Sequence, residues 1–132
     1  MNENIITIAT KKLITAELDD TIHKVLDVID SHNLSCLPVV DSDGKCFGVI
    51  TATDLVHFMS KKLNPDAELA WEVCTHKVLE VSPKTPIKEV AQLMIDNNIH
   101  HVVISENSTI IGIVSSLDLV HEYVIDHPKE KF

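Results

Sequence analysis

The sequence contains no long hydrophobic run and is poor in glycine, proline and aromatic residues. Its 132 residues include three Gly, five Pro, one Trp, one Tyr and three Phe. The scarcity of Gly and Pro argues against a disordered or fibrous chain. No segment is apolar over a length that could span a bilayer, and the first residues lack the basic start of a signal peptide. We therefore expect a folded protein that does not enter a membrane.

Cysteine is also scarce, and its number and spacing argue against a disulfide framework and a Cys-x-x-Cys motif. The three cysteines, Cys36, Cys46 and Cys74, are odd in number and form no Cys-x-x-Cys motif. This usage is typical of a reducing compartment, where free thiols serve as small apolar core residues. We therefore expect a cytoplasmic protein with structural thiols rather than a disulfide framework.

Basic residues are outnumbered, with 11 Lys and Arg against 20 Asp and Glu and a formal net charge of −9. A chain this acidic, without a basic cluster, is a poor candidate for general binding to nucleic acid or to anionic membranes. Any bound anion must be held by local groups. The apolar residues make up 45% of the chain, enough to bury the core of one domain or of two small halves.

One short stretch occurs twice, and the chain is organised around it. The sequence GVITATD at residues 48–54 has a counterpart, GIVSSLD, at residues 112–118, and both continue into Leu-Val-His. A short β-branched apolar segment precedes each hydroxyl residue, and apolar residues at helical spacing follow it, which predicts a strand that turns directly into a helix. Such a turn presents backbone N–H groups and the positive end of a helix dipole, which suit a phosphate or a polar sugar edge.

The same pattern has a purely structural interpretation. Ser/Thr-x-x-Asp is an ordinary helix start, in which the hydroxyl caps the helix and the acid three residues later bonds back. The pattern occurs at corresponding places in both halves, which favours a binding role more than a single copy would. Spacing alone still leaves both interpretations open.

The remainder of the chain follows one plan around both copies. The expected strands are 13–16, 35–40 and 46–51 in the first half and 78–81, 101–105 and 110–115 in the second. The expected helices begin at Asp20 and after Thr51 in the first half, and at Thr85 and near Ser116 in the second. Each half therefore reads β-α-β-β-α. Neither is large enough to be stable alone, so we expect the halves to pack about a pseudo-twofold axis with two related clefts.

The predicted boundaries follow from this plan. Residues 1–62 form the first repeat with an extended N-terminal lead-in. Residues 63–76 form a linker helix, which starts at Asn64-Pro65-Asp66 and continues through Trp71. Residues 77–127 form the second repeat, and residues 128–132 form a tail.

The motif, its order and its duplication resemble the cystathionine β-synthase (CBS) domain pair, also called a Bateman module. The resemblance covers residues 8–125 and includes LSCLPVV at residues 34–40, which is similar to the second strand of the family. Val103 replaces the strand proline in the second half, and the first strand lacks the usual Met-Thr entry. The resemblance implies an α+β fold of two repeats and a regulatory sensor for AMP, ADP, ATP or S-adenosylmethionine, here as a stand-alone pair.

The resemblance also implies a set of ligand-binding residues. Asp54 and Asp118 would accept hydrogen bonds from ribose hydroxyls, because an acceptor-only carboxylate suits a vicinal diol. The residues expected at the phosphate or ribose edge are Thr51 and Ser115, and those expected to flank the adenine ring are Val49 and Ile113.

Nucleotide-binding members of this family often carry a His-Arg pair at the start of a second strand, where it reaches phosphate. Here that place holds His100-His101, which would face the Asp54 site, and the Arg is absent. Ser35-Cys36 hold the matching place for the Asp118 site and supply no cation. We therefore expect two unequal sites, with phosphate read near Asp54.

Catalysis and metal binding have little support in the sequence. The eight histidines lack the spacing of convergent metal ligands, and no nucleophile–base arrangement is visible. Two function classes remain open: a sensor of an adenosine-containing ligand that acts on an unidentified regulated protein, and a ligand-free module for dimerisation or protein interaction. Apolar residues on the second helix of each half predict a homodimer.

Overall fold

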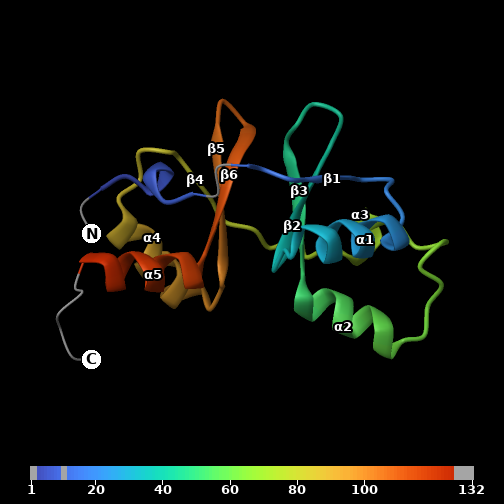
Figure 1. Ribbon diagram of the computed structural model, residues 1–132. Helices are drawn as coiled ribbons and strands as arrows, with labels where there is room; N and C mark the ends of the chain where they lie inside the picture. The colour runs from blue at the N-terminus through green and yellow to red at the C-terminus, as the bar shows by residue number, and fades with distance from the viewer. Residues whose placement is uncertain (1–2, 10–11, 127–132) are drawn as a thin grey trace. The chain divides into compact units, whose positions relative to one another are not determined.

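The computed structural model describes residues 3–9 and 12–126 and divides the chain into two compact units (Figure 1). The central unit is Ile14–Val78. The split unit draws its described residues from Met1–Leu13 and Leu79–Phe132. Each unit contains one three-stranded sheet with its helices, so the predicted α+β fold of two β-α-β-β-α repeats is confirmed.

The central unit is built on the sheet β1-β2-β3, in which β1 pairs parallel to β2 and β2 pairs antiparallel to β3. Its strands are β1 (Ala16–Glu17), β2 (Cys36–Val40) and β3 (Cys46–Thr51), and its helices are α1 (Ile22–His32), α2 (Ala52–Ser60) and α3 (Ala70–Val73). The apolar positions of α1 recur at helical spacing, and Ile22 and Val25 are buried against Leu37 and Ile50 of the sheet.

The split unit repeats this order on the sheet β4-β5-β6. Its strands are β4 (Glu80–Val81), β5 (His101–Glu106) and β6 (Thr109–Ser115), and its helices are the 3₁₀ helix η1 (Ile5–Thr7), α4 (Ile87–Asn97) and α5 (Ser116–Asp126). Its core joins Ile87 and Val90 of α4 to Val102 and Val114 of the sheet. The pairing is again parallel for β4–β5 and antiparallel for β5–β6.

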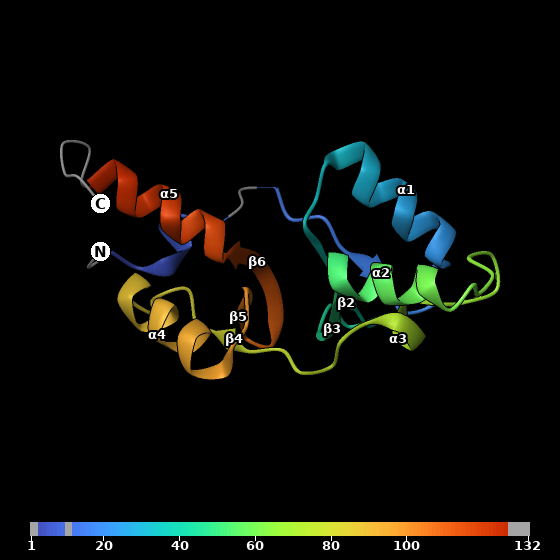
Figure 2. The same ribbon diagram turned by 90° about the horizontal axis from the view of Figure 1, so that it is seen from below.

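Each unit is completed by the segment that precedes the other repeat. Thr75 precedes the second repeat but pairs with Val49 of β3, with N–O distances of 2.9 and 3.0 Å. The lead-in precedes the first repeat, but Ile5 is fully buried in the split unit and its N–H donates to the Thr85 carbonyl at 2.7 Å. Figure 2 shows this N-terminal segment beside α4 and α5. The predicted extended lead-in is wrong at Ile5–Thr7, which forms a 3₁₀ helix in which the Thr7 N–H donates to the Asn4 carbonyl at 3.1 Å.

Two predicted helix caps are wrong. The N-cap of α1 is Thr21, whose hydroxyl accepts the Lys24 N–H at 3.2 Å, because the Asp20 carboxylate accepts the Glu17 N–H at 2.9 Å instead. The N-cap of α4 is Pro86 rather than Thr85, whose hydroxyl lies 3.3 Å from that of Ser82.

The linker is less helical than the sequence predicts. Residues 64–67 form a turn closed by the Ala67 N–H and the Asn64 carbonyl at 3.1 Å, and helix is confined to α3. The Asn64 side chain takes part in this turn, since its Oδ1 accepts the Asp66 N–H at 2.9 Å. Asn and Pro stabilise a turn here more readily than a helix.

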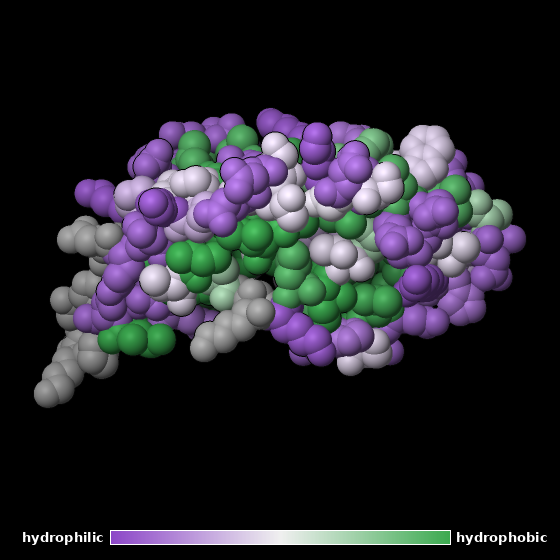
Figure 3. Space-filling view, turned by 90° about the horizontal axis from the view of Figure 1, so that it is seen from above, coloured by the Kyte–Doolittle hydropathy of each residue, from purple (hydrophilic) through white to green (hydrophobic). Residues whose placement is uncertain are grey.

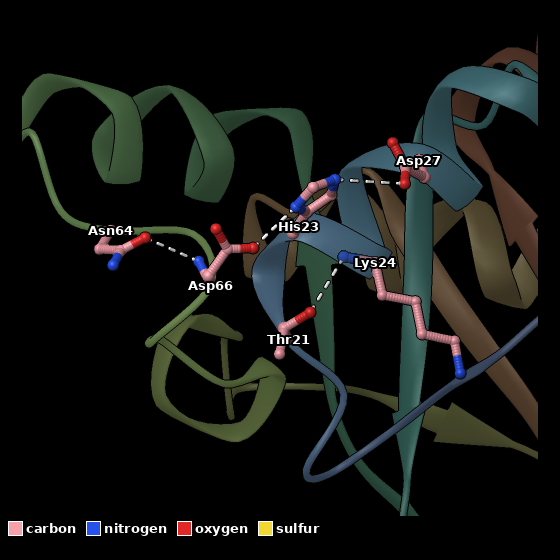
Figure 4. Close-up of polar contacts among 6 residues, drawn as sticks. All are labelled: Thr21, His23, Lys24, Asp27, Asn64 and Asp66. Carbon is pink, nitrogen blue, oxygen red and sulfur yellow. Dashed lines mark hydrogen bonds and ion pairs between the residues drawn. The ribbon is translucent and has the colours of Figure 1, made fainter.

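His23 joins α1 to this turn (Figure 4). Its Nδ1 lies 2.7 Å from Asp66 Oδ1, its Nε2 lies 3.5 Å from Asp27 Oδ2, and its backbone N–H donates to the Pro65 carbonyl at 3.0 Å. The hydrogen bond to Asp66, followed by the charges of Asp27 and Asp66, raises the pKa of His23 above its usual 6.5. Protonation of this imidazole therefore favours the folded state.

We expect His23→Gln to lose more stability in acid than in base. Because the pKa of His23 is higher in the folded protein than in the unfolded chain, its protonation stabilises the fold. This stabilisation is fully present below the pKa of the unfolded chain, about 6.5, and is lost as the pH rises through the pKa of the folded protein. The difference in unfolding free energy between wild type and variant should thus be larger at about pH 5.5 than at about pH 8.5, as measured by urea titration. The effect should be small, since the pair is exposed. Equal differences at the two pH values would contradict it.

Candidate functional site

The first copy of the repeated stretch forms a strand-to-helix turn without an intervening loop. Strand β3 ends at Thr51, which is also the N-cap of α2. The Thr51 hydroxyl accepts the Asp54 N–H at 3.3 Å, and Asp54 Oδ2 accepts the Thr51 N–H at 2.8 Å. This reciprocal pair is a complete capping box, so the structural role of the motif is confirmed for the first copy.

The Asp54 carboxylate has a further partner from outside the motif. Its Oδ1 accepts the Thr75 hydroxyl at 2.7 Å, while its Oδ2 faces Thr51. A carboxylate offers about four lone-pair sites, so these bonds fix its orientation and leave acceptor capacity for a ligand. Asp54 is half-buried, which strengthens any hydrogen bond that it accepts.

The second copy has the same geometry at the start of α5. Asp118 Oδ2 accepts the Ser115 N–H at 2.8 Å, and the Ser115 hydroxyl accepts the Asp118 N–H at 3.2 Å. The Ser116 N–H donates to the His100 carbonyl at 2.8 Å. One of the N–H groups that could serve an anion at this helix start is therefore already bonded within the protein.

The two predicted second-strand pairs lie beside these turns in their own units. Strand register places Cys36 opposite Thr51 and His101 opposite Ser115. Cys36 is buried and Ser35 is exposed. The structure therefore brings each pair next to the hydroxyl residue of its own repeat.

His101 is not poised to carry a positive charge. Burial lowers its pKa below the usual 6.5, the neighbouring His100 lowers it further, and the Asp118 carboxylate acts in the opposite direction. The imidazole is therefore mainly neutral at pH 7. This argues against the expectation that His101 supplies charge to a phosphate.

The two predicted adenine-flanking residues differ in exposure. Val49 is buried, and both its N–H and its C=O bond to Thr75. Ile113 is half-buried and pairs with Val103. A ligand near Val49 would therefore meet the backbone of β3 and of the Thr75 segment.

Sequence reasoning missed Thr75 and Cys74, which it placed in the linker. Burial and the Asp54 charge raise the pKa of the Cys74 thiol to about 11, so this thiol stays protonated. One sequence signal does mark the segment: IATKK at residues 8–12 and VCTHK at residues 73–77 share a Thr and a Lys at matching places. Extending the repeat upstream would have identified Thr75.

Two groups of three acidic side chains in the part of the chain that the structure describes lie within 4.8 Å of one another. They are Glu3, Glu122 and Asp126 in the split unit and Glu17, Asp19 and Asp20 in the central unit. Neither contains His or Cys, and neither includes a residue of the two repeated motifs. None of the helices within residues 3–9 and 12–126 has both the length and the apolar character needed to cross a bilayer.

A family model for the CBS domain matches residues 3–61 and 70–125. Since these matches cover most of the chain and fall on its two repeats, the protein belongs to the CBS domain family, with the two repeats forming a CBS domain pair.

Two of the curated relatives are much longer than this chain. It is 32% identical over 113 residues to L-aspartate semialdehyde sulfurtransferase of Methanocaldococcus jannaschii, a match that covers 85% of this chain and 21% of that protein. It is 26% identical over 114 residues to inosine-5'-monophosphate dehydrogenase of the same organism, covering 86% of this chain and 22% of that protein. The chain thus spans about a fifth of the length of these two relatives.

One solved structure is similar to this chain over almost the whole length of both chains. It is the CBS domain pair of protein MJ0100 in complex with 5'-methylthioadenosine and S-adenosyl-L-methionine, with a TM-score of 0.86 and 26% identity. The alignment covers 96% of this chain and 99% of that one.

Proposed function

We propose that this chain is a regulatory sensor module that binds an adenosine-containing ligand at its strand-to-helix turns and does not catalyse a reaction. The observation that carries this proposal is the pair of half-buried carboxylates, Asp54 and Asp118, each fixed at the start of a helix. Both are oriented by a backbone N–H and are suited to accept the hydroxyls of a ribose. The high pKa of the Cys74 thiol beside one of them disfavours nucleophilic chemistry there.

We further propose that S-adenosylmethionine or 5'-methylthioadenosine is preferred over AMP, ADP and ATP. Three observations support this order: the net charge of −9, the lowered pKa of His101, and the bond that occupies the Ser116 N–H. All three disfavour phosphate, and a negative field favours the sulfonium of S-adenosylmethionine. The domain pair of MJ0100, solved with such ligands, is consistent with this preference.

A thermal-shift screen tests the proposal directly. A ligand that binds only the native state stabilises it by about 2.7 kcal/mol at a hundredfold excess over Kd. We expect S-adenosylmethionine or 5'-methylthioadenosine to raise Tm clearly, adenosine less, and ATP least. If no adenosine compound shifts Tm, the sensor function is wrong and the interaction module described next is favoured.

The second candidate, a protein-interaction module, rests on an apolar strip along α5. This strip consists of Leu119, Val120, Tyr123 and Val124, of which Val120 is 55% and Val124 is 46% exposed. Apolar surface of this kind is typical of an interface. A second copy of the chain is the partner that we propose for it, and the resulting homodimer is compatible with either function.

We also propose a reducing, cytoplasmic setting. Cys36, Cys46 and Cys74 are all reduced, and none is joined in a disulfide. An unidentified regulated protein is the partner that the sensor proposal requires.

A further inference from the structure

A groove in the central unit lies at the opposite end of the β2–β3 hairpin from Asp54. The register places Cys36 opposite Thr51 at one end of the hairpin and Val40 opposite Cys46 at the other. At about 3.4 Å per residue, the two ends are roughly 14 Å apart. The groove has a volume of about 720 Å³, within the range of ligand pockets. It is therefore separate from the strand-to-helix turn.

Two aromatic side chains form part of its lining. Phe47 of β3 is 38% exposed and Trp71 of α3 is 46% exposed, although the chain has only five aromatic residues of the Phe, Tyr and Trp types. The Phe47 ring is held in an edge contact with the His76 ring, at 4.8 Å between centroids and an interplanar angle of 77°. Exposed aromatic faces attract cations and pack on the aliphatic stems of Lys and Arg.

The other notable lining residues are acidic. Glu17, Asp19 and Asp41 line the groove, and no Lys or Arg is among the described residues that line it. Carboxylate oxygens of Glu17, Asp19 and Asp20 lie within 4.8 Å of one another. Asp20 already pairs with Lys24 Nζ at 3.2 Å, so a bound cation would relieve the repulsion that remains between Glu17 and Asp19.

The walls of the groove are held in place by backbone hydrogen bonds. The Trp71 N–H donates to the Leu18 carbonyl at 3.1 Å, and the Ala70 N–H donates to the Asp20 carbonyl at 2.8 Å, so α3 is fixed against the turn after β1. Asp41 Oδ1 accepts the Asp43 and Lys45 N–H groups at 2.9 and 3.0 Å, which fixes the hairpin turn. Preorganised walls reduce the entropic cost of binding.

We propose that this groove docks a basic segment of a partner protein. In this arrangement Lys or Arg side chains lie against Trp71 and Phe47, and their charges face Glu17, Asp19 and Asp41. A segment with several basic residues can neutralise all three carboxylates, whereas a single amine would neutralise one and leave the charges of the other two uncompensated. The net charge of −9 would also accelerate the approach of a basic partner.

Recognition at this groove depends on side chains rather than on strand addition, because the Glu17 N–H of β1 already bonds to Asp20 Oδ2 at 2.9 Å. The proposal does not depend on adenosine binding. On the central unit, at the right of Figure 3, hydrophobic residues are exposed next to hydrophilic ones.

Because Trp71 is the only tryptophan of the chain, its fluorescence reports directly on the groove. The probe is a short peptide that alternates Arg and Gly, titrated at low salt. We expect a saturable change in Trp71 emission and an affinity at least tenfold lower for the double variant Glu17→Lys, Asp19→Lys, with circular dichroism confirming its fold. Phe47→Ala should also weaken binding while retaining the reporter.

The matched control is Asp30→Lys, Glu106→Lys, which changes net charge equally at exposed sites outside the groove. This variant should bind the peptide within about threefold of wild type, since screened distant charges contribute little. An equal loss in the control variant, or equal binding of a peptide that alternates Glu and Gly, would overturn the proposal. If spermidine instead produces the same Trp71 change and binds more tightly than the peptide, the occupant is a free polycation and the commitment to a protein segment fails.

Discussion

The substitution Gly48→Ala is expected to lower the free energy of unfolding by roughly 3 kcal/mol, at the upper end of the usual range for overpacking. A Cβ at this position would lie 2.6 Å from the Thr75 carbonyl oxygen and 2.8 Å from Cys74 Sγ. The Thr75 backbone cannot move aside cheaply, because two hydrogen bonds tie it to Val49. Urea titration of the wild type and the variant measures the loss.

Gly112→Ala is the matched control in the split unit. Its Cβ would lie 3.3 Å from the Ala9 side chain, and its next neighbour, a side-chain atom of Ile104, is at 3.7 Å. A small shift relieves this contact, and alanine also reduces the entropy of the unfolded chain, so we expect a change of about 1 kcal/mol or less. Equal losses for the two variants would contradict the role assigned to the Thr75 segment.

Removing both carboxylates, in the double variant Asp54→Ala, Asp118→Ala, is expected to weaken binding of S-adenosylmethionine by at least tenfold. Each carboxylate can form charge-assisted hydrogen bonds to ribose hydroxyls, worth about 1.5–3 kcal/mol each. The variant also loses the hydrogen bonds that the Thr51 and Ser115 N–H groups donate to these carboxylates, at about 1 kcal/mol each. Calorimetric titration of the folded protein separates affinity from stability.

Thr21→Ala provides the control for this experiment. It removes the side-chain cap of α1 but touches neither strand-to-helix turn, so it should cost about 1 kcal/mol of stability and leave affinity unchanged. If the double Asp variant behaves in the same way, Asp54 and Asp118 act only as caps and the ribose role is wrong.

The parts of the fold that depend on local pattern could be predicted from the sequence. Strand β3 was predicted with its observed bounds, and the start of α5 was predicted correctly, because apolar alternation and the hydroxyl residue mark these boundaries. The caps were harder, since Asp20 and Thr21 are adjacent and both residue types favour the N-cap. Asp20 accepts a hydrogen bond from the Glu17 N–H, which leaves Thr21 as the N-cap. A helical pattern in the sequence does not reveal this contact.

The residues of the candidate site that were predicted are those that lie close together in the sequence. The Thr51–Asp54 and Ser115–Asp118 pairs follow from the capping-box spacing. Thr75 is 21 residues from Asp54, and no periodicity links them. The lowered pKa of His101 depends on burial, which the sequence of a strand end does not specify.

The exchange of segments between the repeats also has a consequence for the order of events during synthesis. Domains fold as units as they emerge from the ribosome, generally from the N-terminus. The central unit, Ile14–Val78, has all its residues available once Val78 has emerged. Ile5 is made earlier than this unit, but its neighbours Ile87, Val90 and Leu119 are made after it. The Ile5 side chain therefore stays exposed to solvent until α5 has been synthesised.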